Sequence, residues 1–177
     1  NKKEFNLEVI ESAFGPGLNE EITRSELDRE MIEDKVCYFL DVKREESEAL
    51  LEGCTFVYSK TKRVRNVHAS DGQHIISPRL RDGGLSLTLE GAKRLHGSDM
   101  PTVVVNDDSI PFTRKGRNVM HGFISEVKGH LNPGLPCLLE SEDGMFLGHG
   151  VALCTASEAR CFTKGIAVKV RDGIGED

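Results

Sequence analysis

The second half of this chain alternates short apolar segments with glycine- and proline-rich turns, and this alternation limits the folds open to it. Many short strands at regular spacing are typical of a closed barrel or a sandwich. Turns are predicted at 132–134 and 142–144, and short helices at 109–115 and 156–162. The predicted strands are 102–105, 118–124, 135–140, 145–152 and 165–170.

The first half mixes helical and strand patterns. The predicted helices are 19–33, 43–51 and 90–95, and the predicted strands are 36–40, 54–58 and 85–89. Gly53 ends the second helix, and Asp82-Gly83-Gly84 is a strong turn signal before the last strand. A break at 98–101 divides the chain into an N-terminal α+β domain, 1–98, and a C-terminal β-barrel domain, 101–173. The predicted fold class is therefore α+β.

The net charge of −6, taken as one number, argues against nucleic acid as a partner. The acidic excess is confined to the first third, however, because residues 1–60 hold 8 Lys and Arg against 15 Asp and Glu. Residues 61–100 carry a net charge of +3, and residues 101–177 carry −2. Nucleic-acid binding depends on a local basic face rather than on the total charge. Net charge therefore leaves this function open.

The cysteines and the hydropathy pattern bear on the cellular compartment. Five cysteines without paired spacing predict buried, reduced thiols rather than a disulfide framework or a zinc site. No apolar run approaches the roughly 20 residues of a membrane helix, and residues 1–5 lack the apolar segment of a signal peptide. We expect a cytoplasmic protein without membrane association, metal or cofactor. The cysteines are Cys37, Cys54, Cys137, Cys154 and Cys161.

The first basic segment, residues 114–118, places a glycine among cations: Arg114-Lys115-Gly116-Arg117-Asn118. Glycine lets the backbone come close to a ligand, and its N–H group can face a phosphate. Arginine side chains bind phosphate oxygens through paired hydrogen bonds. The alternative is a glycine that ends a helix, decorated with solvated cations.

The second basic segment, residues 164–171, contains Lys164, Gly165, Lys169 and Arg171. Lys169 and Arg171 have the same parity along a strand, so they project from one face. The opposite face, which we expect to meet the core, carries Ile166, Val168 and Val170. The alternative here is an edge strand that its cations protect from aggregation.

The order strand, short helix, basic-glycine turn and then a run of strands resembles the PUA domain, an RNA-binding module, over residues 101–173. The segment is also similar to the C-terminal PUA domain of archaeal tRNA-guanine transglycosylases, and residues 82–92 resemble the part that leads into it. The residues that carry the resemblance are Val104-Val105-Asn106-Asp107-Asp108, Pro111-Phe112, Lys115-Gly116-Arg117-Asn118-Val119, Gly148, Gly150 and Lys164-Gly165-Ile166-Ala167-Val168-Lys169-Val170-Arg171.

The resemblance implies where RNA binds. In PUA domains the strand after this glycine packs beside the first helix, and together they form the RNA surface. The two basic segments are therefore expected to lie on one patch and to contact RNA, with tRNA as the expected ligand. A separately encoded transglycosylase catalytic subunit is a further expected partner. A third group could extend this footprint; we call it the N-terminal basic stretch, and it comprises Lys60, Lys62, Arg63, Arg65, Arg79 and Arg81.

No catalytic residue is predicted. A tRNA-guanine transglycosylase needs two catalytic aspartates on a (β/α)8 barrel, which takes roughly 250 residues and is longer than this chain. Asp107 and Asp108 are adjacent and point apart on an extended chain, so they make a poor acid–base pair. The motifs G-x-S-x-G, G-x-G-x-x-G and the P-loop are absent, although a Cys/His pair stays open.

Two functions of different classes remain. The first is binding of structured RNA, since only 6% of the residues are aromatic and a stacking platform for single strands is not indicated. The second is a protein-interaction module in translation or ribosome biogenesis, with the acidic first third as its docking surface.

Overall fold

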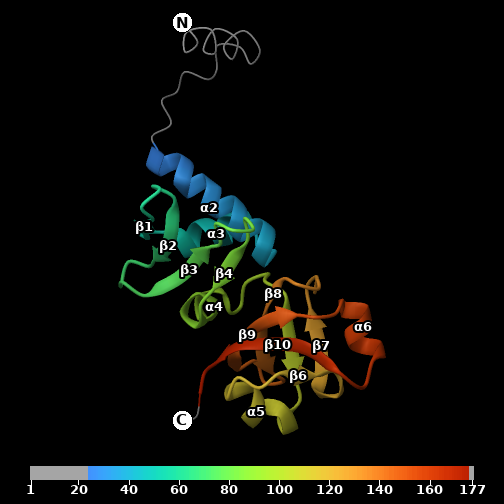
Figure 1. Ribbon diagram of the computed structural model, residues 1–177. Coiled ribbons are helices and arrows are strands. Elements are labelled where there is room, and N and C mark those ends of the chain that lie inside the picture. The colour runs from blue at the N-terminus through green and yellow to red at the C-terminus, as the bar shows by residue number, and fades with distance from the viewer. Residues whose placement is uncertain (1–23, 176–177) are drawn as a thin grey trace, which may run out of the picture. The chain divides into compact units, whose positions relative to one another are not determined.

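The computed structural model describes residues 24–175 (Figure 1). The chain divides into two units, residues 1–31 and 32–177. The described residues of the first unit, 24–31, are the beginning of helix α2 (Arg24–Leu40). The predicted helix at 19–33 is thus confirmed from Arg24 on, and its first residues lie outside the described part of the chain.

The predicted strand at 36–40 is wrong, because α2 continues through these residues to Leu40. Ile32, Val36 and Leu40 recur every fourth residue and are 0% exposed, so they form one buried face of a helix. Tyr38, which a buried strand would enclose, is 75% exposed. A short apolar run satisfies both patterns, and here the helical spacing from Ile32 decides between them.

After α2 the chain forms a four-stranded antiparallel sheet in the order β1-β2-β3-β4. Helices α3 and α4 and strands β1 and β4 confirm predicted elements, whereas β2 and β3 occupy residues for which no strand was predicted. The elements are α3 (Arg44–Leu51), β1 (Thr55–Tyr58), β2 (Val64–His68), β3 (His74–Pro78), β4 (Leu85–Leu87) and α4 (Leu89–Leu95).

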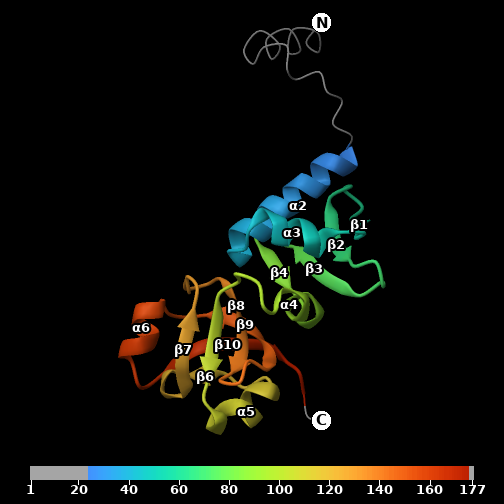
Figure 2. The ribbon, with the colours of Figure 1, turned by 180° about the vertical axis from the view of Figure 1, so that it is seen from behind.

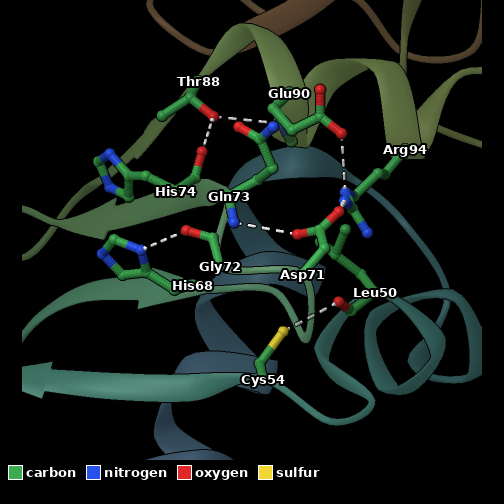
Figure 3. A network of polar contacts seen from close by, with 11 residues as sticks. Leu50, Cys54, His68, Asp71, Gly72, Gln73, His74, Thr88, Glu90 and Arg94 are labelled. Carbon is green, nitrogen blue, oxygen red and sulfur yellow. Dashed lines mark hydrogen bonds and ion pairs between the residues drawn. The ribbon is translucent and has the colours of Figure 1, made fainter.

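Helix α4 packs closely on β3 because Gly91 has no side chain. A Cβ atom at this position would lie 2.4 Å from the carbonyl oxygen of Ile75. Thr88 caps the helix: its Oγ1 accepts from the Gly91 N–H (3.2 Å) and donates to the His74 carbonyl (2.7 Å), as Figure 3 shows. The sheet and α4 therefore form one packed unit.

Polar contacts also attach the β2–β3 turn to α4 (Figure 3). The Arg94 guanidinium donates to Glu90 (3.1 Å) and to Asp71. The Asp71 carboxylate also accepts from the Gln73 backbone N–H (3.0 Å), and this bond and Arg94 lower the pKa of Asp71. The hairpin is thus held to the helix by charge as well as by packing.

Residues 102–173 form a six-stranded sheet in the order β6-β10-β9-β8-β5-β7. Strands β5 and β8 pair in parallel and the other neighbours pair antiparallel. Figure 2 shows that the sheet curls, with α5 and α6 beside it. The elements are β5 (Thr102–Val105), η2 (Asp107–Ser109), α5 (Ile110–Arg114), β6 (Val119–Met120), η3 (His121–Phe123), β7 (Ile124–Lys128), β8 (Pro136–Ser141), β9 (Phe146–Ala152), α6 (Ala156–Cys161) and β10 (Ile166–Gly173).

The α+β prediction with a curled, barrel-like sheet at the C-terminal end is therefore confirmed. One predicted strand, 118–124, is divided into the two-residue β6, a 3-10 turn and the start of β7. Among residues 24–175, no helix is long and apolar enough to cross a membrane.

A buried carboxylate connects α4 to the six-stranded sheet. Glu140 of β8 has a side chain that is 8% exposed; it contacts Lys128 of β7 and lies 3.0 Å from Nε2 of His96, just after α4. Burial by itself raises the pKa of Glu140, but the bonds from Lys128 and His96 outweigh it and lower that pKa overall. Glu140 therefore connects the end of α4 to the six-stranded sheet as an ionised group.

Candidate nucleic-acid interface

The first basic segment forms the end of helix α5. The Gly116 N–H donates to the Thr113 carbonyl (2.9 Å), and the Arg117 N–H donates to the Phe112 carbonyl (3.0 Å). Gly116 has a φ of +77°, which glycine adopts without strain. Gly116 thus ends the helix, and this structural role leaves the cations of the segment exposed around it: Lys115 and Arg117 are exposed, and Arg114 is half-buried.

Helix α5 packs directly on the end of β10. A Cβ atom at Gly173 would lie 2.1 Å from the Arg114 carbonyl oxygen, so the contact requires glycine. The Gly175 N–H donates to that carbonyl (2.9 Å), and Nε of Arg114 donates to the Gly175 carbonyl (3.1 Å). Backbone and side chain of Arg114 are both held in place, which positions the basic end of the helix.

The two basic segments lie side by side. Met120 is paired with Ile166 and Val119 with Val168, and the His121 N–H donates to the Gly165 carbonyl (3.0 Å). Asn118 belongs to the same contact, because its Oδ1 accepts from the Val170 N–H (3.2 Å). That oxygen therefore has a structural partner, which the sequence pattern did not reveal.

The exposed cations form an elongated surface rather than a compact patch. Lys164 and Gly165 lie near His121, whereas Arg171 lies towards the α5 end of β10. Arg171 lies six residues along the chain from Gly165, a distance of about 20 Å at ~3.3 Å per residue of strand. A ligand that contacts all of these cations has to be extended, as a nucleic-acid backbone is.

The predicted faces of β10 are mostly correct. Lys169 and Arg171 are exposed, and Val168 and Val170 are buried. Ile166 is the exception at 41% exposed, because the pairing with β6 is irregular between residues 166 and 168. The edge-strand alternative is wrong for residues 166–168, where β10 pairs with β6 as well as with the neighbouring part of the sheet, whereas the residues from Lys169 to Gly173 pair with β9 alone among the described strands.

The N-terminal basic stretch lies on two turns at the same end of the four-stranded sheet. The β1–β2 turn carries Lys60, Lys62 and Arg63, all exposed, and Arg65 is exposed on β2. The β3–β4 turn carries the other two members, Arg79 and Arg81. Nε of Arg79 donates to Oδ1 of Asp82 (3.0 Å).

A cavity of about 350 Å³ brings together one arginine of the N-terminal basic stretch and one arginine of the second basic segment. Arg79 of the β3–β4 turn and Arg171 of β10 both line it. His149 of β9 also lines the cavity and is 2% exposed. Its Nε2 lies 3.1 Å from Oδ2 of Asp172. Burial lowers the pKa of His149 despite Asp172, so this histidine is neutral near pH 7.

The sequence pattern missed the pair of His149 and Asp172. The run Gly148-His149-Gly150 is too short to be a phosphate fingerprint, and nothing local links it to a residue 23 positions later. The pair forms because β9 and β10 place His149 opposite Asp172. Among residues 24–175, no group of three or more His, Cys, Asp or Glu is arranged to hold a metal ion.

Two family models match successive parts of the chain. Residues 43–101 match the patch-forming domain C2 of tRNA-guanine transglycosylase, and residues 101–174 match the PUA domain. PUA domains are non-catalytic, and the prediction of a region without catalytic residues agrees with a match to this region. The predicted domain limits, 1–98 and 101–173, stay a prediction.

Curated relatives agree with both matches. The tRNA-guanine(15) transglycosylase of Thermococcus onnurineus is 36% identical over 131 residues, which are 72% of this chain and 22% of the relative. That of Methanothermobacter thermautotrophicus is 39% identical over 116 residues, 64% of this chain and 18% of the relative. The chain thus spans about a fifth of the length of these relatives.

Solved structures support the fold. A hypothetical protein of Pyrococcus horikoshii superposes with a TM-score of 0.64 at 17% identity, over 85% of this chain and 92% of that one. A PUA domain of Aeropyrum pernix reaches 0.50 at 20% identity, over 76% and 85%. Successive parts of this chain thus match a C2 domain and a PUA domain, and the chain is similar to the C2–PUA region of the archaeal tRNA-guanine transglycosylases.

Proposed function

We propose that this chain binds structured RNA, with tRNA as its ligand, through the surface that α5 and β10 form. The observation that carries the proposal is the pairing of 118–121 with 165–170 inside a PUA domain. This pairing brings together the two segments that carry the exposed side chains of Lys115, Arg117, Lys169 and Arg171, which we call the basic strip.

Binding at such a strip is mainly electrostatic. Each cation that neutralises a phosphate releases condensed counterions, so affinity falls as salt rises. Lys169 and Arg171 stand on β10, whose residues 168–173 pair with β9, and the strand therefore presents these two cations at fixed spacing. An A-form backbone is recognised through such spacing and through shape rather than through base edges.

A salt-dependent titration tests the proposal. Filter binding of labelled, unfractionated tRNA is measured at several salt concentrations for the wild type, for Arg117→Ala/Lys169→Ala and for Lys93→Ala. The double variant is expected to bind about tenfold or more weakly, with a salt slope reduced by about one or two. Lys93 is exposed on α4, outside both basic segments, so its variant serves as the matched control. Salt-insensitive binding, or none, contradicts the proposal.

The chemistry on the bound tRNA belongs, in this proposal, to a transglycosylase catalytic subunit working with this chain in the cytoplasm. Support comes from the curated relatives, which are tRNA-guanine(15) transglycosylases of which the chain spans about a fifth. Guanine incorporation into tRNA by a catalytic domain taken from such a relative should increase when this chain is added. Stimulation that is equal for wild type and Arg117→Ala/Lys169→Ala argues against RNA delivery as the reason.

A further inference from the structure

The cavity of about 350 Å³ is lined by two groups of residues that are far apart in the sequence. One group comes from the β3–β4 turn and β4, the other from β8, β9 and β10. Its size is near the lower end of the range for small-molecule sites, which suits a ligand of the size of one nucleotide. Phe39 and Leu85 add an apolar wall.

Two arginines provide the positive charge of this cavity. Arg171 is exposed on β10 next to His149, whose pKa its charge helps to lower. Arg79 is exposed on the β3–β4 turn, where its Nε donates to Asp82 and its Nη2 lies close to Gly84, so a ligand would contact the outer side of the guanidinium. Two guanidinium groups from different elements are well suited to hold one phosphate between them.

One carboxylate limits the class of ligand. Asp172 also lines the cavity, and its charge disfavours a bare inorganic anion. Its Oδ2 is bonded to the buried His149, so the carboxylate is oriented while its side chain stays 57% exposed. An oriented carboxylate is an acceptor for hydroxyl donors, and in nucleotide sites it binds ribose hydroxyls.

Strand β4 supplies further polar groups. It is an edge strand, since β3 is its single neighbour in the four-stranded sheet, and residues 85–87 line the cavity. Edge strands carry peptide N–H and C=O groups that the sheet does not use. The cavity thus combines cations, one fixed acceptor, peptide groups and an apolar wall.

We propose that this cavity holds one ribonucleotide of the bound RNA, with its phosphate between Arg79 and Arg171 and its ribose 2′-hydroxyl on Asp172. The proposal rests on the RNA-binding function above and extends it, because the RNA then bridges the C2 and PUA domains. It also makes one contact specific for RNA over DNA, since DNA lacks the 2′-hydroxyl.

A double-mutant cycle tests the shared phosphate. Affinity for unfractionated tRNA is measured for Arg79→Ala, Arg171→Ala and the combination, with circular dichroism melting to verify the fold. Each single change is expected to weaken binding about threefold, and the combination by clearly less than the product of the two. The combination of Arg79→Ala with Lys169→Ala is the matched control, because Lys169 lies on β10 like Arg171 but does not line the cavity. The loss of affinity of this combination should equal the product of its two single losses.

A nucleotide titration provides the second arm. Adenosine 5′-monophosphate and its 2′-deoxy form are titrated against the full chain by ¹H–¹⁵N NMR. The ribonucleotide is expected to shift the amides of Ser86, His149 and Val151 at several-fold lower concentration than the deoxy form, and Asp172→Ala should remove this difference.

The outcomes separate the two proposals. The cavity assignment is overturned if the Arg79→Ala/Arg171→Ala combination loses affinity by the full product of the two single losses. It is also overturned if both nucleotides shift the amides at the same concentration. Either result leaves tRNA binding through α5 and β10 intact. If wild type binds no tRNA, the proposed function fails, and the nucleotide arm still decides the cavity.

Discussion

The two cationic regions of this protein are built in opposite ways. On the PUA domain, Lys169 and Arg171 stand on β10, which pairs with β9 and whose alternate residues Val168 and Val170 are buried. On the C2 domain, most of the cations stand on turns of a sheet whose edge strands β1 and β4 have one unpaired side each. The PUA cations are positioned by a hydrophobic core, whereas Arg79 is positioned by an ion pair with Asp82 at the surface.

This difference indicates which region determines affinity. Cations fixed by a core lose little conformational freedom when they bind, while cations on turns have to be ordered at that moment. The PUA surface is therefore expected to supply most of the binding, and the C2 turns to adjust it.

The strongest test of this contrast uses one glycine from each region. At Gly173 an added Cβ meets the backbone of α5, with the Arg114 carbonyl oxygen at 2.1 Å, and a backbone atom cannot move aside alone. At Gly84 the added Cβ meets the Arg79 side chain, which is flexible. Gly173→Ala should lower the free energy of unfolding by about 3 kcal/mol, and Gly84→Ala by less than about 1 kcal/mol. Urea denaturation measures both, and equal losses contradict the contrast.

The next largest expected change in stability concerns Glu140, the carboxylate that connects the end of α4 to the six-stranded sheet. Glu140→Gln removes the charge that Lys128 and His96 contact, and should cost about 2 kcal/mol of unfolding free energy at pH 7. Because the pKa of Glu140 is lowered on folding, the ionised group stabilises the protein above its ordinary pKa of 4.5, and this contribution is lost as pH falls through the folded pKa.

The pH dependence is therefore the control for this change. The wild type should lose its advantage over Glu140→Gln as the pH falls below about 4.5, in denaturation measured at stepwise pH. If the wild type still has the higher free energy of unfolding at pH 2, the effect of Glu140→Gln comes from packing rather than from charge.

A smaller effect compares one exposed arginine of each region. Arg117→Ala should weaken tRNA binding about fivefold, because its strip is fixed by β10, while Arg63→Ala on the β1–β2 turn should change it less than about twofold. Both side chains are exposed, which makes the pair a matched comparison by filter binding. A larger loss for Arg63→Ala reverses the assignment of the main binding surface.

The mildest test uses the native cysteines and no mutation. Burial raises the pKa of Cys137, in the PUA core, to about 12, so this thiol should resist alkylation until the domain unfolds. Cys54 is half-buried against the core of the C2 domain, and Cys161 is exposed. Mass spectrometry after pulsed alkylation in increasing urea should show Cys161 labelled first; simultaneous labelling of Cys54 and Cys137 indicates one cooperative unit.

Local patterns predicted those features that depend on neighbouring residues. Helix α3 and its end at Gly53, the strand at 102–105 and the alternation of Val168, Lys169 and Val170 all follow from spacing along a few positions. The strand assigned to 36–40 failed because its decisive partner, Ile32, lies outside the five-residue run.

Long-range register accounts for the rest. The bond from Val170 to Asn118, the pair of His149 and Asp172, and the approach of Arg79 to Arg171 depend on which strands become neighbours. No local pattern contains that information. The candidate site was therefore predictable as a set of segments but not as a cavity.

The position of β10 in its sheet also has a consequence for synthesis. It is the last strand of that sheet along the chain, yet it pairs between β6 and β9 and carries the packing surface for α5. The ribosome therefore makes all the other strands of this sheet before the one that completes its core and carries half of the proposed RNA surface. Until residues 166–173 emerge, a nascent chain cannot close this domain, so RNA binding of the proposed kind would also report that the domain has been made in full.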